Sequence, residues 1–210
     1  MDINDITDIN YTISKNYIEK YNNSWEIIPN IYNIIIELIK NIDKELFNNM
    51  GNNIWVYKDV VIDDNVKILG PCIIDEGTVI KHSAYIRENV IIGKNCIIGN
   101  ASEIKNSIIF DKCEIPHFNY VGDSIMGYKS HLGAGTIIAN LRLDKANIFI
   151  KNNNKTIDTG LNKMGAIIGS NVEIGANSVI NPGTVIYSNT IIYPLTRVKG
   201  IIKSDRIIVN

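Results

Sequence analysis

A six-residue hydrophobic repeat occupies most of the 210-residue chain. An apolar residue recurs in strict steps of six from Ile62 to Ile104, and after two five-residue steps the series reaches Ile138. It resumes at Ile168 and runs in steps of six to Val198. Mostly small or β-branched residues stand four positions further on, and Gly often follows the apolar residue. The chain is therefore dominated by one repeating unit.

A period of six fits neither an α-helix nor a hairpin meander, but three such units make one triangular coil of a parallel β-helix. The apolar residue of each unit points inward, and the Gly or polar residues form the corners. The pattern resembles the hexapeptide-repeat family, whose coils wind left-handed. It predicts a mainly β protein, a left-handed parallel β-helix over residues 51–200 with a short N-terminal α-helical segment.

Residues 1–50 follow a different pattern, with no Gly before Gly51 and apolar residues in steps of three and four from Ile28 onward. These steps indicate an amphipathic helix with Pro29 in its first turn and Gly51 at its end. A weaker helix is predicted over 13–21. We expect this segment to pack on the main domain as a lid rather than to bind a partner.

Two further segments depart from the repeat. The polar, basic stretch at about 142–164 is predicted to be an irregular insertion loop, and insertions of this length are usually functional or mobile. Residues 201–210 form a C-terminal tail whose isoleucines would add a last strand or cover the final coil.

Composition narrows the function classes. With 21 basic and 22 acidic residues, the formal net charge of −1 gives no indication of a nucleic-acid partner or an acidic membrane surface. The richest apolar run, 27–42, contains Pro29, Glu37 and Lys40, so it does not fit a membrane span, and the first residues lack the apolar core of a signal peptide. We expect a cytoplasmic protein.

The register places two cations together. Positions three repeats apart stack about 4.8 Å from each other, so Arg87 and Lys105, which each follow an inward isoleucine, occupy the same position on successive coils. Like charges this close repel by about 1 kcal/mol even when solvated. A bridging phosphate would remove that cost; the alternative is two solvated side chains that splay apart.

A histidine stands at a corner of the same region. His117 follows Pro116, which stiffens the backbone, and its side chain is expected to point outward. By the register Tyr120 stacks over Glu103, and His117 stacks over Asn100. A neutral histidine beside a carboxylate is a suitable general base; the alternative is an exposed polar residue with no catalytic part.

Four segments resemble known families. E-I-K at 103–105, P-H-F-N-Y-V-G-D at 116–123 and L-G-A-G-T-I-I-A-N-L-R at 132–142 are similar to the acetyltransferase half of the bifunctional glucosamine-1-phosphate acetyltransferase/N-acetylglucosamine-1-phosphate uridylyltransferases. D-T-G-L-N-K-M-G-A-I-I-G at 158–169 resembles relatives in which a sugar-1-phosphate nucleotidyltransferase is fused to this β-helix. The resemblance extends over about 54–199.

The resemblance implies an acetyl-CoA-dependent N-acetyltransferase that acts on an amino-sugar 1-phosphate, either glucosamine-1-phosphate or galactosamine-1-phosphate. It also implies a homotrimer with its sites between subunits. The implied roles are as follows: His117 as general base, Glu103 as the supporting acid, Arg87 and Lys105 as phosphate ligands, Tyr120 and Asn140 as substrate contacts, and Ala134 and Ala176 along the acetyl-CoA arm.

The chain departs from the bifunctional enzymes in three ways. The roughly 50 residues before the repeat are too few for the nucleotidyltransferase domain and hold no Gly-rich phosphate loop, so no nucleotidyltransferase activity is expected. His131 and Leu141 stand where those enzymes have Asn and Tyr. These two positions leave open which amino sugar is used and whether catalysis is retained.

Two other functions stay open. The γ-class carbonic anhydrases, also hexapeptide proteins, bind zinc through three histidines, and this chain has three: His82, His117 and His131. Their spacing lacks a ligand about five residues after His117, and the three cysteines form no metal-ligand pattern and are expected to be buried fillers, so no metal is expected. The second alternative is a non-catalytic trimer that binds a sugar phosphate or nucleotide sugar and scaffolds a partner through the N-terminal helices.

Overall fold

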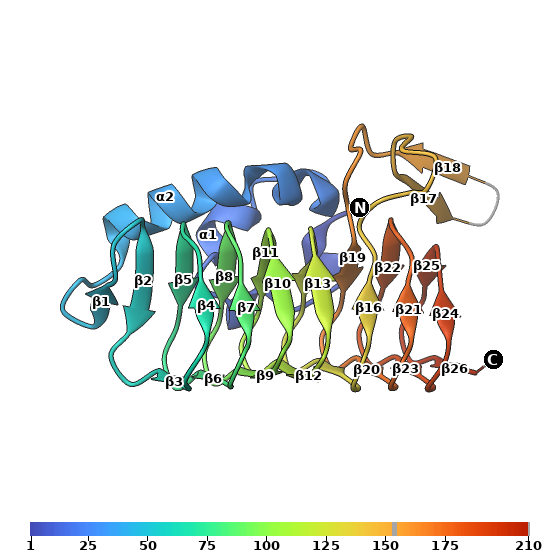
Figure 1. Cartoon of the computed structure of the whole chain (residues 1–210). Helices are drawn as coiled ribbons and strands as arrows, with labels where there is room; N and C mark the ends of the chain where they lie inside the picture. The colour runs from blue at the N-terminus through green and yellow to red at the C-terminus, as the bar shows by residue number, and fades with distance from the viewer. Residues whose placement is uncertain (153–154, 210) are drawn as a thin grey trace.

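The computed structural model describes residues 1–152 and 155–209 and forms a parallel β-helix with helices along one side (Figure 1). The chain visits three sheets in rotation, so that every third strand pairs with its predecessor in parallel. Each coil therefore contributes one strand to each sheet. The predicted fold, a left-handed parallel β-helix of hexapeptide repeats with a short N-terminal helical segment, is confirmed.

The nine-stranded sheet lies beneath the helices. Its strands, in spatial order, are β1 (Phe47–Asn49), β2 (Ile54–Tyr57), β5 (Cys72–Ile74), β8 (Val90–Ile92), β11 (Ser107–Ile109), β14 (Ile125–Met126), β19 (Ala166–Ile168), β22 (Thr184–Ile186) and β25 (Ile201–Ile202).

The other two sheets form the remaining sides of the prism. The seven-stranded sheet contains β4 (Lys67–Ile68), β7 (Tyr85–Ile86), β10 (Glu103–Lys105), β13 (Tyr120–Gly122), β16 (Ile137–Ile138), β21 (Val179–Ile180) and β24 (Arg197–Val198). The eight-stranded sheet contains β3 (Val61–Ile62), β6 (Val79–Ile80), β9 (Ile97–Asn100), β12 (Glu114–His117), β15 (His131–Leu132), β20 (Glu173–Ile174), β23 (Ile191–Ile192) and β26 (Ile207–Ile208).

The apolar residues of the repeat fill the interior of the prism. Ile86, Ile104 and Val121 pair in register and are fully buried. The five-residue steps preserve this stacking, since Ile109 pairs with Met126 directly after the first of them. Many corners use a left-handed backbone conformation, and asparagine tolerates it better than most residues, as at Asn95 (φ 54°). The frequent asparagines therefore serve the corners.

The N-terminal segment covers the nine-stranded sheet. It consists of the 3₁₀ helices η1 (Ile3–Asp5), η2 (Ile9–Tyr11) and η3 (Ser24–Asn30) and the α-helices α1 (Lys15–Ile18) and α2 (Ile31–Asn41). Ile27, Ile31 and Ile35 pack with the outward isoleucines of the sheet, such as Ile91 and Ile108, in a second apolar core. The expectation of a helical lid packed on the main domain is confirmed.

Three details of the sequence-based prediction are wrong. The long helix ends at Asn41 rather than near Gly51, because Ile42 is extended (ψ 149°) and the chain then adds β1 antiparallel to β2. The weaker helix shrinks to the four residues of α1. The insertion is not irregular, since β17 (Phe149–Asn152) and β18 (Lys155–Asp158) form an antiparallel hairpin anchored by the buried Ile148 and Ile150.

The covered sheet yields a stability prediction. Ile91 and Ile97 both precede an inward isoleucine, but Ile91 is fully buried under the helices whereas Ile97 is 38% exposed. Ile91→Ala is expected to lower the free energy of unfolding by about 2–5 kcal/mol, and the matched Ile97→Ala by about 1 kcal/mol or less. Urea unfolding followed by circular dichroism measures both. Equal losses would contradict the packing of the lid on this sheet.

Candidate functional site

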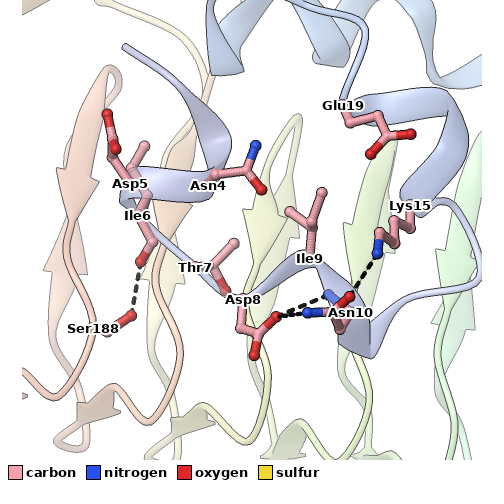
Figure 2. Close-up of a pocket in the computed structure, with 10 residues that line it drawn as sticks. All are labelled: Asn4, Asp5, Ile6, Thr7, Asp8, Ile9, Asn10, Lys15, Glu19 and Ser188. Carbon is pink, nitrogen blue, oxygen red and sulfur yellow. Dashed lines mark hydrogen bonds between the residues drawn. The ribbon is translucent and has the colours of Figure 1, made fainter.

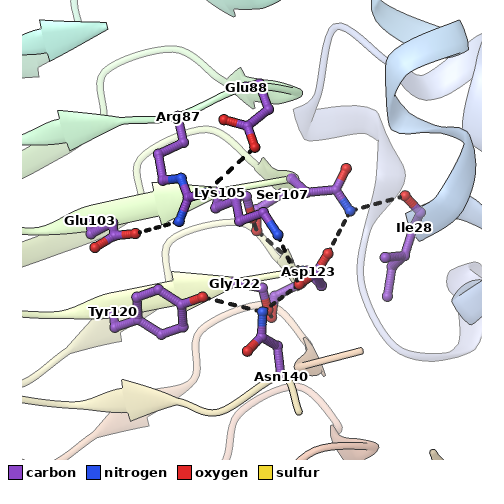
Figure 3. Close-up of polar contacts among 12 residues, drawn as sticks. Ile28, Arg87, Glu88, Glu103, Lys105, Ser107, Tyr120, Gly122, Asp123 and Asn140 are labelled. Carbon is purple, nitrogen blue, oxygen red and sulfur yellow. Dashed lines mark hydrogen bonds and ion pairs between the residues drawn. The ribbon is translucent and has the colours of Figure 1, made fainter. Parts of the chain in front are cut away.

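Arg87 and Lys105 stack on successive coils of the seven-stranded sheet, as the register predicts, since the Arg87 amide donates to the carbonyl of Ile104. Each cation has a carboxylate beside it (Figure 3). Arg87 Nη1 lies 3.0 Å from Glu103 Oε1, and Lys105 Nζ lies 4.0 Å from Asp123 Oδ2. Carboxylates of the chain itself therefore offset both charges, a contribution that the register alone did not include.

Tyr120 and Asn140 lie beside this pair. Tyr120 stacks on Glu103, as predicted, and its hydroxyl accepts a hydrogen bond from Asn140 Nδ2 at 3.2 Å. Burial raises the pKa of Tyr120, and the nearby Asp123 and Glu103 carboxylates raise it further. The phenol therefore stays protonated at neutral pH and can donate a hydrogen bond to a ligand.

Asp123 is a central residue that the sequence analysis did not single out. Its carboxylate accepts hydrogen bonds from Asn140 Nδ2 and from Asn106 Nδ2, the latter at 2.8 Å, and faces Lys105. Its backbone is left-handed (φ 49°). The available signal was its place at the end of the segment 116–123, directly after a Gly at a corner.

His117 ends β12 at the corner between the eight-stranded and the seven-stranded sheets, and its side chain is exposed. It pairs with Asn100 below, and its carbonyl accepts the amide of Gly135 above. By the same register Ala134 lies directly over His117, and Ala176 follows one coil higher, where the Asn177 amide donates to the carbonyl of Ala134. The next two positions above His117 in this column are therefore alanines, whose side chains are methyl groups.

The predicted residues therefore form two sets. One, on the seven-stranded sheet, contains Arg87, Glu103, Lys105, Tyr120 and Asn140; the other, at the adjoining corner, contains His117, Ala134 and Ala176. Glu103 is bound to Arg87, and within residues 1–152 and 155–209 no hydrogen bond or ion pair reaches the imidazole of His117. The corner of residues 117–120 joins the two sets.

The two positions that the resemblance predicts to differ from the bifunctional enzymes, His131 and Leu141, line grooves on the surface of the prism. His131 Nδ1 is 3.1 Å from Glu173 Oε2, and both residues line a groove of about 400 Å³ that also includes Ala176. Leu141 is 44% exposed and lines a second groove, of about 540 Å³, between the insertion and the last coils. The first groove therefore includes one predicted site residue, Ala176, whereas the second includes none of them.

A third groove, of about 440 Å³, lies along the N-terminal segment (Figure 2). Its polar groups serve mainly to hold the segment in place: Ser188 Oγ donates to the carbonyl of Ile6, and Lys15 Nζ donates to Asn10 Oδ1. It contains none of the predicted site residues.

The described residues contain no group of three or more His, Cys, Asp or Glu side chains that could hold a metal ion. His82 lies two coils below His117, and His131 pairs with Glu173 on the sheet face, so the three histidines do not converge. The cysteines are buried fillers, as expected, and burial raises the pKa of Cys113 to about 12. Over the described part of the chain, no helix has the length and apolar character needed to cross a bilayer.

The chain is similar in sequence to several known proteins. Residues 68–161 match the family model of the GMPPB C-terminal domain. A bifunctional protein GlmU from Methanococcus maripaludis is 42% identical over 130 residues, which are 53% of this chain and 31% of that protein. A bifunctional sugar-1-phosphate nucleotidylyltransferase/acetyltransferase from Sulfurisphaera tokodaii is 35% identical over 172 residues, which are 73% of this chain and 41% of that protein.

The chain thus spans less than half the length of these curated relatives. Among solved structures, a hexapeptide transferase family protein from Anaplasma phagocytophilum aligns over 62% of this chain and 67% of its own, with 16% identity and a TM-score of 0.48. The fold assignment rests on the strand order and not on that likeness. By strand order the chain is a parallel β-helix of hexapeptide repeats, and by sequence it is similar to part of the bifunctional GlmU proteins.

Proposed function

We propose that the protein is an acetyl-CoA-dependent N-acetyltransferase whose acceptor is an amino-sugar 1-phosphate, glucosamine-1-phosphate or galactosamine-1-phosphate. One observation carries the proposal: an exposed imidazole, His117, lies under a column of alanines and adjoins a sheet face that carries the stacked Arg87 and Lys105. Sequence similarity to a protein named as a bifunctional sugar-1-phosphate nucleotidylyltransferase/acetyltransferase supports it.

The two cations retain donors for a phosphate. Arg87 donates from Nη1 to Glu103, and its Nη2 lies 3.6 Å from Glu88 Oε1, beyond hydrogen-bond distance, so protons of the two terminal nitrogens remain available. Lys105 Nζ lies 4.0 Å from its carboxylate, beyond hydrogen-bond distance, so its ammonium protons remain available. A phosphate that spans the two coils would contact the forked guanidinium of Arg87 and the compact ammonium of Lys105. Tyr120 and Asn140 would then contact the sugar.

The reaction assigned to His117 is general acid–base catalysis. The amine nitrogen attacks the thioester carbonyl carbon and forms a C–N bond. As it does so, His117 takes a proton from the nitrogen. The tetrahedral intermediate collapses with cleavage of the C–S bond, and the proton passes from the imidazolium to the leaving CoA thiolate. Glu103 supports the site through its hydrogen bond to Arg87.

Acetyl-CoA would lie along the corner above His117. Ala134 and Ala176 project only methyl groups there, so the pantetheine arm can approach the backbone. The two sheets that the helices do not cover carry half-exposed apolar residues, such as Ile137 and Val179 on the seven-stranded sheet and Ile191 on the eight-stranded one. These faces suit packing of copies into the homotrimer that would complete each site.

The test is acetyl transfer from acetyl-CoA to each of the two amino-sugar 1-phosphates, measured as release of free thiol. We expect one of them to be acetylated, by a preparation whose mass in light scattering equals three chains. If neither amine is acetylated by the trimer, the proposal is wrong. Binding of a sugar phosphate without turnover would favour the non-catalytic alternative.

A further inference from the structure

Asp123 is nearly buried, yet it faces the polar groups of the proposed phosphate site (Figure 3). Only 6% of its side chain is exposed, against 16% for Lys105 and 32% for Arg87. A carboxylate can only accept hydrogen bonds, and Asp123 accepts two of them, from Asn140 Nδ2 and Asn106 Nδ2. The ammonium of Lys105 lies 4.0 Å from the same carboxylate.

Backbone hydrogen bonds also hold Asp123 in place. The Asp123 amide donates to the carbonyl of Lys105, and its carbonyl accepts the amide of Gly165 from beyond the insertion. Asn106 Nδ2 also points to the carbonyl of Ile28 in η3, at 3.4 Å. The carboxylate is thus tied to two coils of the prism, and through Asn106 to the helical lid.

We propose that Asp123 is a positioning residue: it holds the ammonium of Lys105 and the amide of Asn140 in the orientation that receives the sugar phosphate, and Asn106 holds Asp123. This inference rests on the proposed function, because it assumes that Lys105 binds a phosphate. Asp123 itself lies too deep to touch the ligand. It acts through Lys105 and Asn140.

A role in which Asp123 only screens the charge of Lys105 would change phosphate affinity in the opposite direction. If Asp123 only screened Lys105, its removal would raise the local positive charge and tighten phosphate binding. Positioning predicts weaker binding, because Asp123→Asn puts a donor amide where two side chains already donate. Asn keeps the left-handed backbone accessible, so the substitution changes charge and hydrogen bonding rather than the corner.

The experiment is a double-mutant cycle on ligand binding. The Kd values of glucosamine-1-phosphate, galactosamine-1-phosphate and glucosamine are measured by calorimetry for the wild type, Asp123→Asn, Lys105→Ala and the double variant. We expect Asp123→Asn to weaken binding of the tighter phosphate ligand about tenfold and binding of glucosamine by about twofold or less. The double variant should lose less affinity than the product of the two single losses, since residues that act as one unit are not additive.

A second pair of variants protects the test against misfolding. Asn106 and Asn171 both adopt positive φ, 44° and 55°, and both donate side-chain hydrogen bonds, but Asn171 lies away from the site and bonds to Asn189. Glycine tolerates this backbone. Asn106→Gly should weaken binding of the phosphate ligand about threefold or more, and Asn171→Gly should leave it unchanged.

Three results would overturn the inference: unchanged or tighter phosphate binding by Asp123→Asn, losses in the double variant that multiply, or no binding of either sugar phosphate by the wild type. Acetyl transfer is assayed in parallel. Binding that follows the cycle without any acetyl transfer refutes the proposed reaction and leaves the role of Asp123 supported. Acetyl transfer together with additive losses in the cycle supports the proposed reaction and refutes the role of Asp123.

Discussion

Replacement of His117 by alanine is expected to lower kcat for acetyl transfer by about 10²–10⁴-fold, the range that a positioned general base contributes. The amine would still meet the thioester in the variant, but no side chain at the corner would take its proton. Because His117 is exposed and its ring has no hydrogen-bond partner among the described residues, the substitution should leave the fold intact. Initial rates of thiol release at saturating substrate measure the effect.

His82 provides the matched control. It lies in the same corner column, two coils below His117, and its side chain is also exposed. His82→Ala should therefore keep the rate of the wild type. A His117→Ala variant as active as the wild type would refute the mechanism, whereas equal losses in both variants would point to damage along the corner rather than to a lost base.

Lys105→Ala is expected to raise KM for the amino-sugar 1-phosphate and to lower kcat/KM by the equivalent of about 1–3 kcal/mol, the size of one charge-assisted contact. The reason is the loss of one of the two stacked cations, which leaves Arg87 to hold the phosphate while it also pairs with Glu103. The non-phosphorylated amino sugar should lose much less. Steady-state kinetics with the two acceptors measure the difference.

Lys94→Ala serves as the control for the loss of a paired lysine. Lys94 Nζ lies 2.8 Å from Glu76, at a corner next to the nine-stranded sheet, and both side chains are more exposed than that of Lys105. The Lys94→Ala substitution should leave kcat/KM unchanged. If the wild-type protein used the non-phosphorylated sugar as well as the phosphate, Arg87 and Lys105 would lose their role as a phosphate site.

The stacking of the candidate site could be predicted from the sequence because the repeat fixes the register. A shift by one residue would turn every inward isoleucine outward, so the pairings of Arg87 with Lys105 and of Glu103 with Tyr120 follow from counting. The hydrogen-bond and ion-pair partners of the charged side chains could not be predicted by counting residues. Glu103 was expected beside His117, but it accepts a hydrogen bond from Arg87. A long side chain can reach partners on several coils, so the register alone does not fix which one it contacts.

Asp123 shows the same limit. Its place in the sequence gives a polar corner residue like many others. Only the folded chain brings Lys105, Asn106 and Asn140 around it, since Asn140 arrives from the next coil and Asn106 from the previous one. The end of α2 was missed for a related reason, because Phe47 pairs with Tyr57 in an added strand and packs against its ring, a contact between residues that are distant in the sequence.

The sequence by itself determined the β-helix, its coil-to-coil register and the columns that hold His117 and the two cations, because a period of six admits one way to bury its isoleucines. The tertiary structure decided which of three similar faces is covered. Ile91, Ile97 and Ile137 look alike in sequence, but of the three only Ile91 is buried, since the N-terminal segment packs along its sheet and not along the other two. Burial of that kind depends on segments distant in the chain, and no local pattern records it.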